Sequence, residues 1–296
     1  MKGFLGVATL GASEFGDLVQ ASSDYRDAIE SQSECLPSLT GRCVANVFYE
    51  PSTRTRLSFD LAAQRLGAHV LTFNPGTAST SKGESLRDTV STLAAIGADI
   101  LVVRHSEDFV PQRVAEWTGL PVVNAGDGIN EHPTQALLDA TTLVRHFGVT
   151  SGLRMVIVGD ISHSRVACSL IHAMPLLGVD VSLAGPPEFL PANPGLEAHS
   201  DFEASLSGAD IVYMLRVQEE RGGAITKDYV RDFQLDRSRL GLLSDGAVVM
   251  HAGPLNRGVE IADEVADSPR CLISEQVRNG VPARMAVLSS IARSIG

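Results

Sequence analysis

Short runs of apolar, β-branched residues alternate along the chain with longer segments in which apolar residues recur at helical spacing. The apolar runs predict buried strands at 43–49, 69–73, 99–104, 120–124, 154–160, 179–185, 209–215 and 247–251. The segments between them predict helices at 54–66, 84–97, 133–147, 164–177 and 276–294. Strands that alternate with helices form parallel sheets covered by helices on both faces, so the predicted fold class is α/β.

The predicted strands fall into two sets of about four, which favours two α/β domains over one very wide sheet. We expect the first domain to span 1–133 and the second to span 134–276, with the helix that begins near Pro133 at the joint. The C-terminal helix, from about 277 to 296, is expected to pack back on the first domain. The proline-rich segment 185–195 is expected to be an exposed loop.

Composition excludes several classes of protein. The 296 residues are 44% hydrophobic and 20% charged, which is typical of a globular protein with a substantial core. A net charge of −11 argues against nonspecific nucleic-acid binding, and no apolar run reaches the roughly 18 residues that span a bilayer. The four cysteines are scattered, which favours reduced thiols in a cytoplasmic protein over disulfides or a zinc site: Cys35, Cys43, Cys168 and Cys271. We expect no metal and no organic cofactor.

The first candidate for chemistry is the segment FYEPSTRTR, 48–56, which leaves a predicted strand and enters a predicted helix. A helix N-terminus offers unpaired backbone N–H groups and partial positive charge, so it suits an anion. Hydroxyl groups and a guanidinium from the same turn would add donors for phosphate oxygens, from Ser52, Thr53, Arg54 and Thr55. The alternative is that Ser52 or Thr53 only caps the helix.

Other polar residues follow predicted strands, where ligands of open parallel sheets bind. Arg104 and His132 lie in this position in the first set of strands, and Arg165, Arg216 and Gln218 do so in the second. Two arginines at separate strand ends can hold two carboxylates. The alternatives are that the His132 segment is only a helix start and that each arginine is a solvated surface charge.

The segment 48–56 resembles the phosphate-binding signature of the aspartate and ornithine carbamoyltransferases. The resemblance extends from about residue 40 to the C-terminus, and the first 39 residues match only loosely. The other matching segments are 79–89, 102–107, 124–139, 158–169, 213–221, 250–261 and 276–288. The resemblance implies a reaction in which an amine acceptor takes the carbamoyl group of carbamoyl phosphate and phosphate leaves.

The same resemblance implies roles for individual residues. Thr55, Arg104 and His132 would be catalytic and would face the carbonyl oxygen as it becomes an oxyanion. The residues that would bind carbamoyl phosphate are Ser52, Thr53, Arg54, Thr55, Arg104, His132, Gln135, Gly253 and Pro254. Among these, Gln135 matches the family residue that contacts the carbamoyl amide. The residues that would bind aspartate are Lys82, Arg165, Arg216 and Gln218.

Lys82 is one of only three lysines and lies in a polar loop that, in the family, reaches into the neighbouring subunit. The resemblance therefore implies a homotrimer with shared active sites, and a regulatory chain or dihydroorotase as a further partner stays open. Ser79 or Ser81 would join Lys82, with Ser79 preferred. Arg221 would be a supporting residue that pairs with Glu50 or Glu219.

The choice of acceptor depends on the segment 250–255, where the Gly253–Pro254 bond resembles the family's cis peptide and Ala252 replaces its usual proline. Ornithine enzymes typically carry a cysteine in an H-C-L-P segment here, and this chain has none. Aspartate is therefore the expected acceptor, in de novo pyrimidine biosynthesis. The alternatives are another amine acceptor or a non-catalytic scaffold. No residue is identified as the general base, and the leaving phosphate is one candidate for taking the proton.

Overall fold

The computed structural model describes residues 1–33, 38–73, 83–192, 195–219 and 225–295. The chain divides into two compact units, each with a parallel sheet of its own, which confirms the α/β class. The first unit comprises Met1–Thr141 and Val277–Gly296, and the second comprises Thr142–Gln276. Among the described residues, no helix is long and apolar enough to cross a membrane.

The first unit contains a four-stranded sheet in the order β2-β1-β3-β4. All of its strand pairs are parallel, and each strand except the edge strand β2 is largely buried. The elements of this part of the chain are α1 (Ala12–Glu30), β1 (Cys43–Phe48), α2 (Thr53–Arg65), β2 (His69–Phe73), α3 (Leu86–Ala95), β3 (Ile100–His105), α4 (Val110–Thr118), β4 (Val122–Asp127), α5 (Pro133–Phe147) and α11 (Ile273–Ile295).

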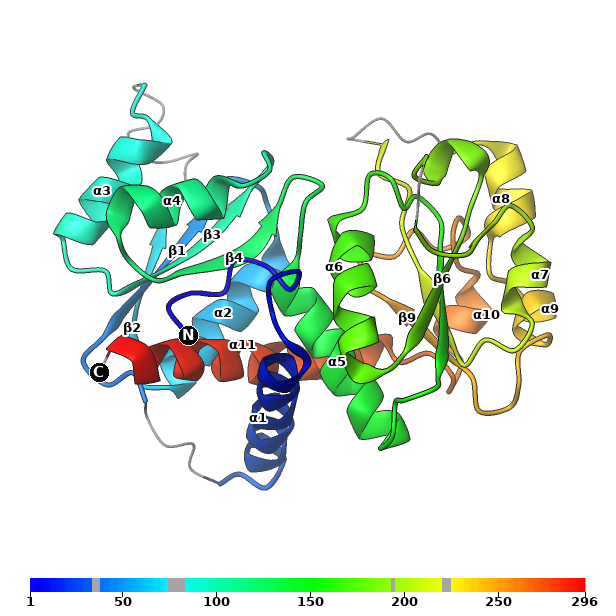
Figure 1. The fold of residues 1–296 in the computed structure, drawn as a ribbon, viewed down its shortest axis with the longest axis horizontal. Coiled ribbons are helices and arrows are strands. Elements are labelled where there is room, and N and C mark those ends of the chain that lie inside the picture. The colour runs from blue at the N-terminus through cyan, green and yellow to red at the C-terminus, as the bar shows by residue number, and fades with distance from the viewer. Residues whose placement is uncertain (34–37, 74–82, 193–194, 220–224, 296) are drawn as a thin grey trace. The chain divides into compact units, whose positions relative to one another are not determined.

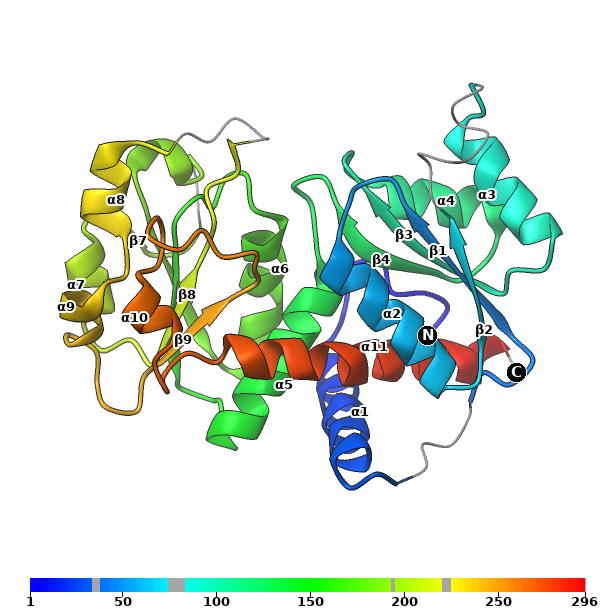
Figure 2. The same cartoon turned by 180° about the vertical axis from the view of Figure 1, so that it is seen from behind.

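Helices cover both faces of this sheet. Figure 1 shows α3 and α4 on one face, and Figure 2 shows α2 and α11 on the other. Residues that alternate along the strands, such as Ala45 and Val47 of β1, pack with Val90 of α3 and Val114 of α4. Their neighbours point to the opposite face, because successive side chains of a strand alternate in direction.

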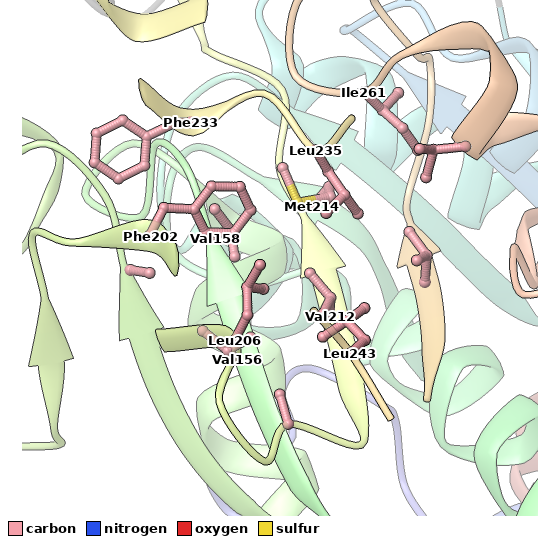
Figure 3. Close-up of a cluster of buried hydrophobic side chains, with 14 of the residues drawn as sticks. Val156, Val158, Phe202, Leu206, Val212, Met214, Phe233, Leu235, Leu243 and Ile261 are labelled. Atoms are coloured by element: carbon pink, nitrogen blue, oxygen red, sulfur yellow. The ribbon is translucent and has the colours of Figure 1, made fainter. Parts of the chain in front are cut away.

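The second unit contains a five-stranded parallel sheet in the order β7-β6-β5-β8-β9. Figure 3 shows apolar side chains of β5 and β8 in contact with those of the surrounding helices, among them Phe202 of α7 and Phe233 of α8. The elements are β5 (Arg154–Val158), α6 (Arg165–Ala173), η3 (Met174–Leu177), β6 (Asp180–Ala184), η4 (Pro187–Phe189), β7 (Ala198–His199), α7 (Phe202–Leu206), β8 (Ile211–Met214), α8 (Lys227–Phe233), α9 (Arg237–Leu240), β9 (Val248–His251) and α10 (Asp263–Ala266).

Two predictions from the sequence need correction. The segment 185–195 is not simply an exposed loop, because Gly185 and Pro186 are buried and η4 places Phe189 in the core. The strand predicted at 120–124 instead spans Val122–Asp127. It begins later because Pro121 has no N–H to donate, and it continues further because its buried polar residues also pair with β3.

Helix α1 was missed because its buried stripe contains polar residues. Ser22 accepts a hydrogen bond from Thr141 at 2.9 Å, and Arg26 donates one to Asn279 at 3.0 Å. Both side chains are buried together with Phe15 and Leu18. A polar residue in a core stripe is stable only when its partner arrives from elsewhere in the fold, and the local pattern of apolar residues does not show that partner.

The packing of Phe202 generates a prediction. Its ring is 2% exposed and stacks on Phe233 with centroids 6.0 Å apart, and the guanidinium of Arg239 lies 5.4 Å from its centre. Phe202→Ala should therefore lower the free energy of unfolding by about 3–5 kcal/mol, measured by urea titration. Leu242→Ala is the control, because Leu242 is 54% exposed and its loss should change stability little. Equal effects of the two substitutions would contradict this packing.

Candidate active site

In the first unit, the turn between β1 and α2 presents a helix N-terminus with its side-chain donors available. Ser52 occupies the N-cap position with extended backbone, but its side chain makes no capping hydrogen bond. Its hydroxyl is half-buried, Thr55 is buried, and Thr53 and Arg54 are exposed. A role for Ser52 in capping therefore does not account for this segment. The first N–H groups of α2 and the neighbouring hydroxyls can instead receive an anion.

Arg104 lies at the carboxyl end of β3, and the sheet register places it beside Phe48 at the end of β1. It is only 8% exposed. Its Nη2 forms an ion pair with Glu50 Oε1 at 2.6 Å, and its Nη1 donates to the backbone oxygen of Ala125 at 3.0 Å. A charge-assisted pair of this length holds the guanidinium in one orientation next to the start of α2.

The loop between β4 and α5 is organised by the buried carboxylate of Asp127. It accepts hydrogen bonds from the side chains of Asn124 at 2.7 Å and Asn130 at 3.0 Å. It also accepts them from the backbone N–H groups of Phe109 at 2.7 Å and Glu131 at 3.2 Å. Four donors from three segments hold the loop that leads into α5. This role of Asp127 was not predicted, because in the sequence it is one polar residue among several.

This loop places two of the predicted residues at the start of α5. His132 is 5% exposed, and its backbone oxygen accepts a hydrogen bond from the N–H of Gln135 at 2.9 Å. The Gln135 side chain is directed by Asp139, which accepts from its Nε2 at 3.0 Å. His132 and Gln135 are therefore brought together within one helical turn of each other in the first unit.

In the second unit, Arg165 is the first residue of α6 and is 5% exposed. The N-cap Ser164 begins this helix, and its hydroxyl accepts a hydrogen bond from Ala167 N–H at 3.2 Å. The turn from β5 into α6 requires a glycine at 159, where φ is +121° and a Cβ atom would lie 2.9 Å from the Leu215 oxygen. The close approach of β5 and β8 at this point sets where the turn begins.

Arg216 and Gln218 follow β8 and contact each other. Arg216 Nη2 donates to Gln218 Oε1 at 3.3 Å, and Gln218 Nε2 donates to the backbone oxygen of Arg216 at 3.2 Å. Asp160, fully buried at the end of β5, accepts from the Gln218 N–H at 3.0 Å and lies 2.7 Å from His163 Nδ1. Asp160 therefore ties together the segments that carry Arg165 and Gln218.

The segment after β9 forms a tight turn that contains the cis Gly253–Pro254 bond predicted from the sequence. The Gly253 N–H donates to His251 Nδ1 at 2.7 Å, so this nitrogen is an acceptor and the proton resides on Nε2. His251 Nε2 then donates to Glu260 Oε1 at 3.1 Å, and the Asn256 N–H donates to the same oxygen at 2.7 Å. Glu260 thus holds both ends of the turn, at His251 and at Asn256.

Several predicted residues lie outside the described part of the chain: Ser79, Ser81, Lys82 and Arg221. Within the described part, no group of histidine, cysteine, aspartate and glutamate side chains has an arrangement that would hold a metal ion. The residues that sequence reasoning missed are acidic or basic side chains inside otherwise apolar segments: Asp127, Asp139, Asp160, Glu260 and Arg284. Their one signal in the sequence is a charge placed where burial is expected.

Comparison with known proteins agrees with this geometry. A family model described as "Aspartate/ornithine carbamoyltransferase, carbamoyl-P binding domain" matches residues 2–145, and one described as "Aspartate/ornithine carbamoyltransferase, Asp/Orn binding domain" matches residues 151–291. The aspartate carbamoyltransferase catalytic subunit of Gluconobacter oxydans is 50% identical over 298 residues, which cover 98% of this chain and 95% of the relative.

Solved structures show the same relationship. Aspartate transcarbamoylase from Trypanosoma cruzi, in complex with carbamoyl aspartate and phosphate, has a TM-score of 0.88 and is 30% identical, covering 98% of this chain and 95% of that one. Ornithine carbamoyltransferase from Pyrococcus furiosus has a TM-score of 0.90 and is 27% identical, covering 100% and 98%. The chain thus has two α/β units, each with a parallel sheet and with basic side chains near the strand ends, as the two-domain carbamoyltransferases have. The chain belongs to the aspartate/ornithine carbamoyltransferase family.

The four hydrogen bonds of Asp127 generate a prediction for stability. Asp127→Asn keeps the size of the side chain but turns one acceptor into a donor that faces other donors. It should lower the free energy of unfolding by about 2–4 kcal/mol, measured by urea titration. Asp245→Asn is the control, because the Asp245 side chain is fully exposed and its one ion pair among the described residues is with Arg270 at 3.3 Å. A change equal to that of the control would contradict the role given to Asp127.

Proposed function

We propose that the protein is an aspartate carbamoyltransferase. It transfers the carbamoyl group of carbamoyl phosphate to the amine of L-aspartate and gives N-carbamoyl-L-aspartate and phosphate, in de novo pyrimidine biosynthesis. The observation that carries the proposal is the start of α2. There the Ser52 hydroxyl makes no capping hydrogen bond, Arg54 is exposed, and the first backbone N–H groups of the helix can bind an anion. The relative from Gluconobacter oxydans, at 50% identity, carries the name of this enzyme.

The first unit supplies the groups for carbamoyl phosphate in this proposal. Ser52, Thr53 and Arg54 bind the phosphate, which a helix N-terminus and a guanidinium suit by charge and geometry. Thr55, Arg104 and His132 donate to the carbonyl oxygen. Arg104 is suited to this role because its ion pair with Glu50 orients the guanidinium before the substrate arrives.

The second unit supplies the groups for aspartate. Arg165 and Arg216 pair with the two carboxylates, and Gln218 adds an amide next to Arg216. Gly253 and Pro254 direct backbone carbonyls at the carbamoyl NH₂, from a turn held by His251 and Glu260. Lys82 of the neighbouring subunit adds a cation for the phosphate and for the acceptor carboxylate.

The reaction follows from these roles. Carbamoyl phosphate binds first, and the uncharged amine of aspartate then attacks its carbonyl carbon. A tetrahedral intermediate forms with its negative oxygen facing Thr55, Arg104 and His132. The bond between the carbonyl carbon and the phosphate oxygen breaks. The departing phosphate takes the proton from the aspartate nitrogen, which is now bonded to the carbamoyl carbon. Neutral donors and cations around the oxygen stabilise the charge that develops in this step.

The proposal includes a cytoplasmic homotrimer. Leu57 and Leu61 lie one turn apart on α2, directly after the phosphate-binding turn, and are 53% and 42% exposed. Apolar side chains at this place suit an interface between copies of the chain, and closed cyclic assembly would let each copy complete its neighbour's site. The described cysteines have free thiols, which suits a reducing compartment: Cys43, Cys168 and Cys271.

The assignment of substrates to residues is tested by two substitutions. The purified protein should form N-carbamoyl-aspartate and should use aspartate better than ornithine. Arg54→Ala should lower turnover by about 10²–10³ through the loss of a phosphate donor. Arg216→Ala should instead raise the KM for aspartate and leave that for carbamoyl phosphate nearly unchanged.

Arg231→Ala is the control for both substitutions, because Arg231 is exposed and, in the described part of the chain, forms ion pairs with Asp228 and Asp232 alone. It should keep wild-type kinetics. Ornithine as the better acceptor would refute the choice of substrate. Equal damage to both KM values by Arg216→Ala would make this residue structural.

The shared site is tested by mixing two inactive variants. Lys82→Ala and Arg54→Ala chains should each be nearly inactive. Trimers reassembled from both should contain sites in which one chain keeps Arg54 and its neighbour supplies Lys82, so the mixture should regain a substantial part of the activity. Mixed trimers that form, as shown by native mass spectrometry, and stay inactive would mean that Lys82 acts in its own chain.

A further inference from the structure

The side-chain amide of Gln135 has a defined orientation. Its Nε2 donates to Asp139 Oδ1 at 3.0 Å, from one helical turn earlier on α5. The amide group is planar with its nitrogen and oxygen on opposite edges, so Oε1 points away from the carboxylate. Within the described part of the chain, the hydrogen bond to Asp139 is the one hydrogen bond of the Gln135 side chain. Gln135 is 8% exposed, so a small part of this largely buried residue still faces solvent.

Asp139 can dictate this orientation only while it is ionised, because a protonated carboxyl group both donates and accepts. Its side chain is completely buried, which by itself disfavours the charge. A buried cation, Arg284 of α11, interacts electrostatically with this carboxylate. Burial and the charge of Arg104 lower the pKa of Arg284, and the Asp139 carboxylate raises it. An arginine keeps its proton in such surroundings, so it supports the Asp139 anion.

Arg284 is itself held in one place. It is 3% exposed, and its Nη1 donates to the backbone oxygen of Gly280 at 2.8 Å. Its guanidinium carbon lies 5.1 Å from the centre of the Phe59 ring of α2, which is a favourable distance for a cation above an aromatic face. The C-terminal helix α11 thus contributes a buried positive charge near Asp139 of α5 and Phe59 of α2.

We propose that Asp139 is a positioning residue that makes Gln135 select the carbamoyl NH₂ group. With one hydrogen of Nε2 held by Asp139, the carbonyl oxygen of Gln135 lies on the opposite edge of the amide, where it accepts a hydrogen from the NH₂ of carbamoyl phosphate. A methyl group at the same position has nothing to donate, so acetyl phosphate is rejected. This inference rests on the proposed function and on the binding of the carbamoyl group at Gln135.

The competing explanation is that Asp139 only stabilises the packing of α5. The two explanations differ in ligand preference. A packing defect weakens all ligands of the first unit alike, whereas loss of amide orientation weakens only the ligand that has an NH₂ group. Acetyl phosphate and inorganic phosphate share the phosphate contacts and lack this group, so they serve as matched probes.

The experiment uses the full-length protein and the variants Asp139→Asn, Gln135→Ala and the double variant. For each, the KM of carbamoyl phosphate and the inhibition constants of acetyl phosphate and inorganic phosphate are measured. Asparagine can both donate and accept, so the Gln135 amide is no longer held in one orientation. We expect the preference for carbamoyl over acetyl phosphate to fall about tenfold in each single variant and no further in the double variant. Inhibition by inorganic phosphate should stay within about twofold of wild type.

Asp139→Glu is the matched control, because it keeps the anionic acceptor and should keep most of the preference. If Asp139→Asn does not fold, Asp139→Ser removes the charge with less crowding and carries the same expectation. Equal weakening of all three ligands, or an effect of Asp139→Asn that adds to that of Gln135→Ala, would overturn the inference. A wild-type protein that makes no N-carbamoyl-aspartate would refute the proposed function instead.

Discussion

Buried carboxylates must find hydrogen-bond donors, and much of the structure around the candidate site depends on this requirement. Asp127, Asp139, Asp160 and Glu260 are all fully buried. A desolvated charge costs several kcal/mol unless it is paired, so each of these groups holds the donors around it in place. Those donors belong to the segments that carry His132, Gln135, Gln218 and the turn after β9. Loops that would otherwise be mobile are therefore organised from within.

The buried cations of the first unit likewise require hydrogen-bond acceptors. Arg104 is buried next to Glu50 and a backbone oxygen, and Arg284 is buried against Phe59 and a backbone oxygen. The two guanidinium groups repel each other, and burial lowers the pKa of Arg284. Each buried guanidinium is therefore held by an oxygen acceptor, Arg104 by Glu50 and Arg284 by the Gly280 backbone.

Local sequence patterns were sufficient for most of the regular structure. The helix predicted at 133–147 matches α5, and the strand predicted at 69–73 matches β2. Helix α5 shows helical apolar spacing over its whole length, and β2 contains the apolar and aromatic residues that are typical of a strand. The two-residue strand β7 and the short helices α7, α9 and α10 escaped prediction, since segments of two to five residues carry too little periodicity. Helix α4, with nine residues, also escaped prediction. Helix α1 escaped because its polar core residues are satisfied by Thr141 and Asn279, which are far away along the chain.

For the candidate site, motifs in the sequence predict which residues touch a ligand, since Ser52, Arg104 and Arg216 each lie at or after the end of a recognisable strand. The residues that orient them are another matter. Asp139 directs Gln135 and Arg284 supports Asp139, yet nothing near Arg284 in the sequence connects it with α5. Contact with a ligand requires particular residue types next to strand ends, which is a local pattern. The pairing of buried charges joins groups from distant segments, and only the folded chain brings those groups within a few ångströms of each other.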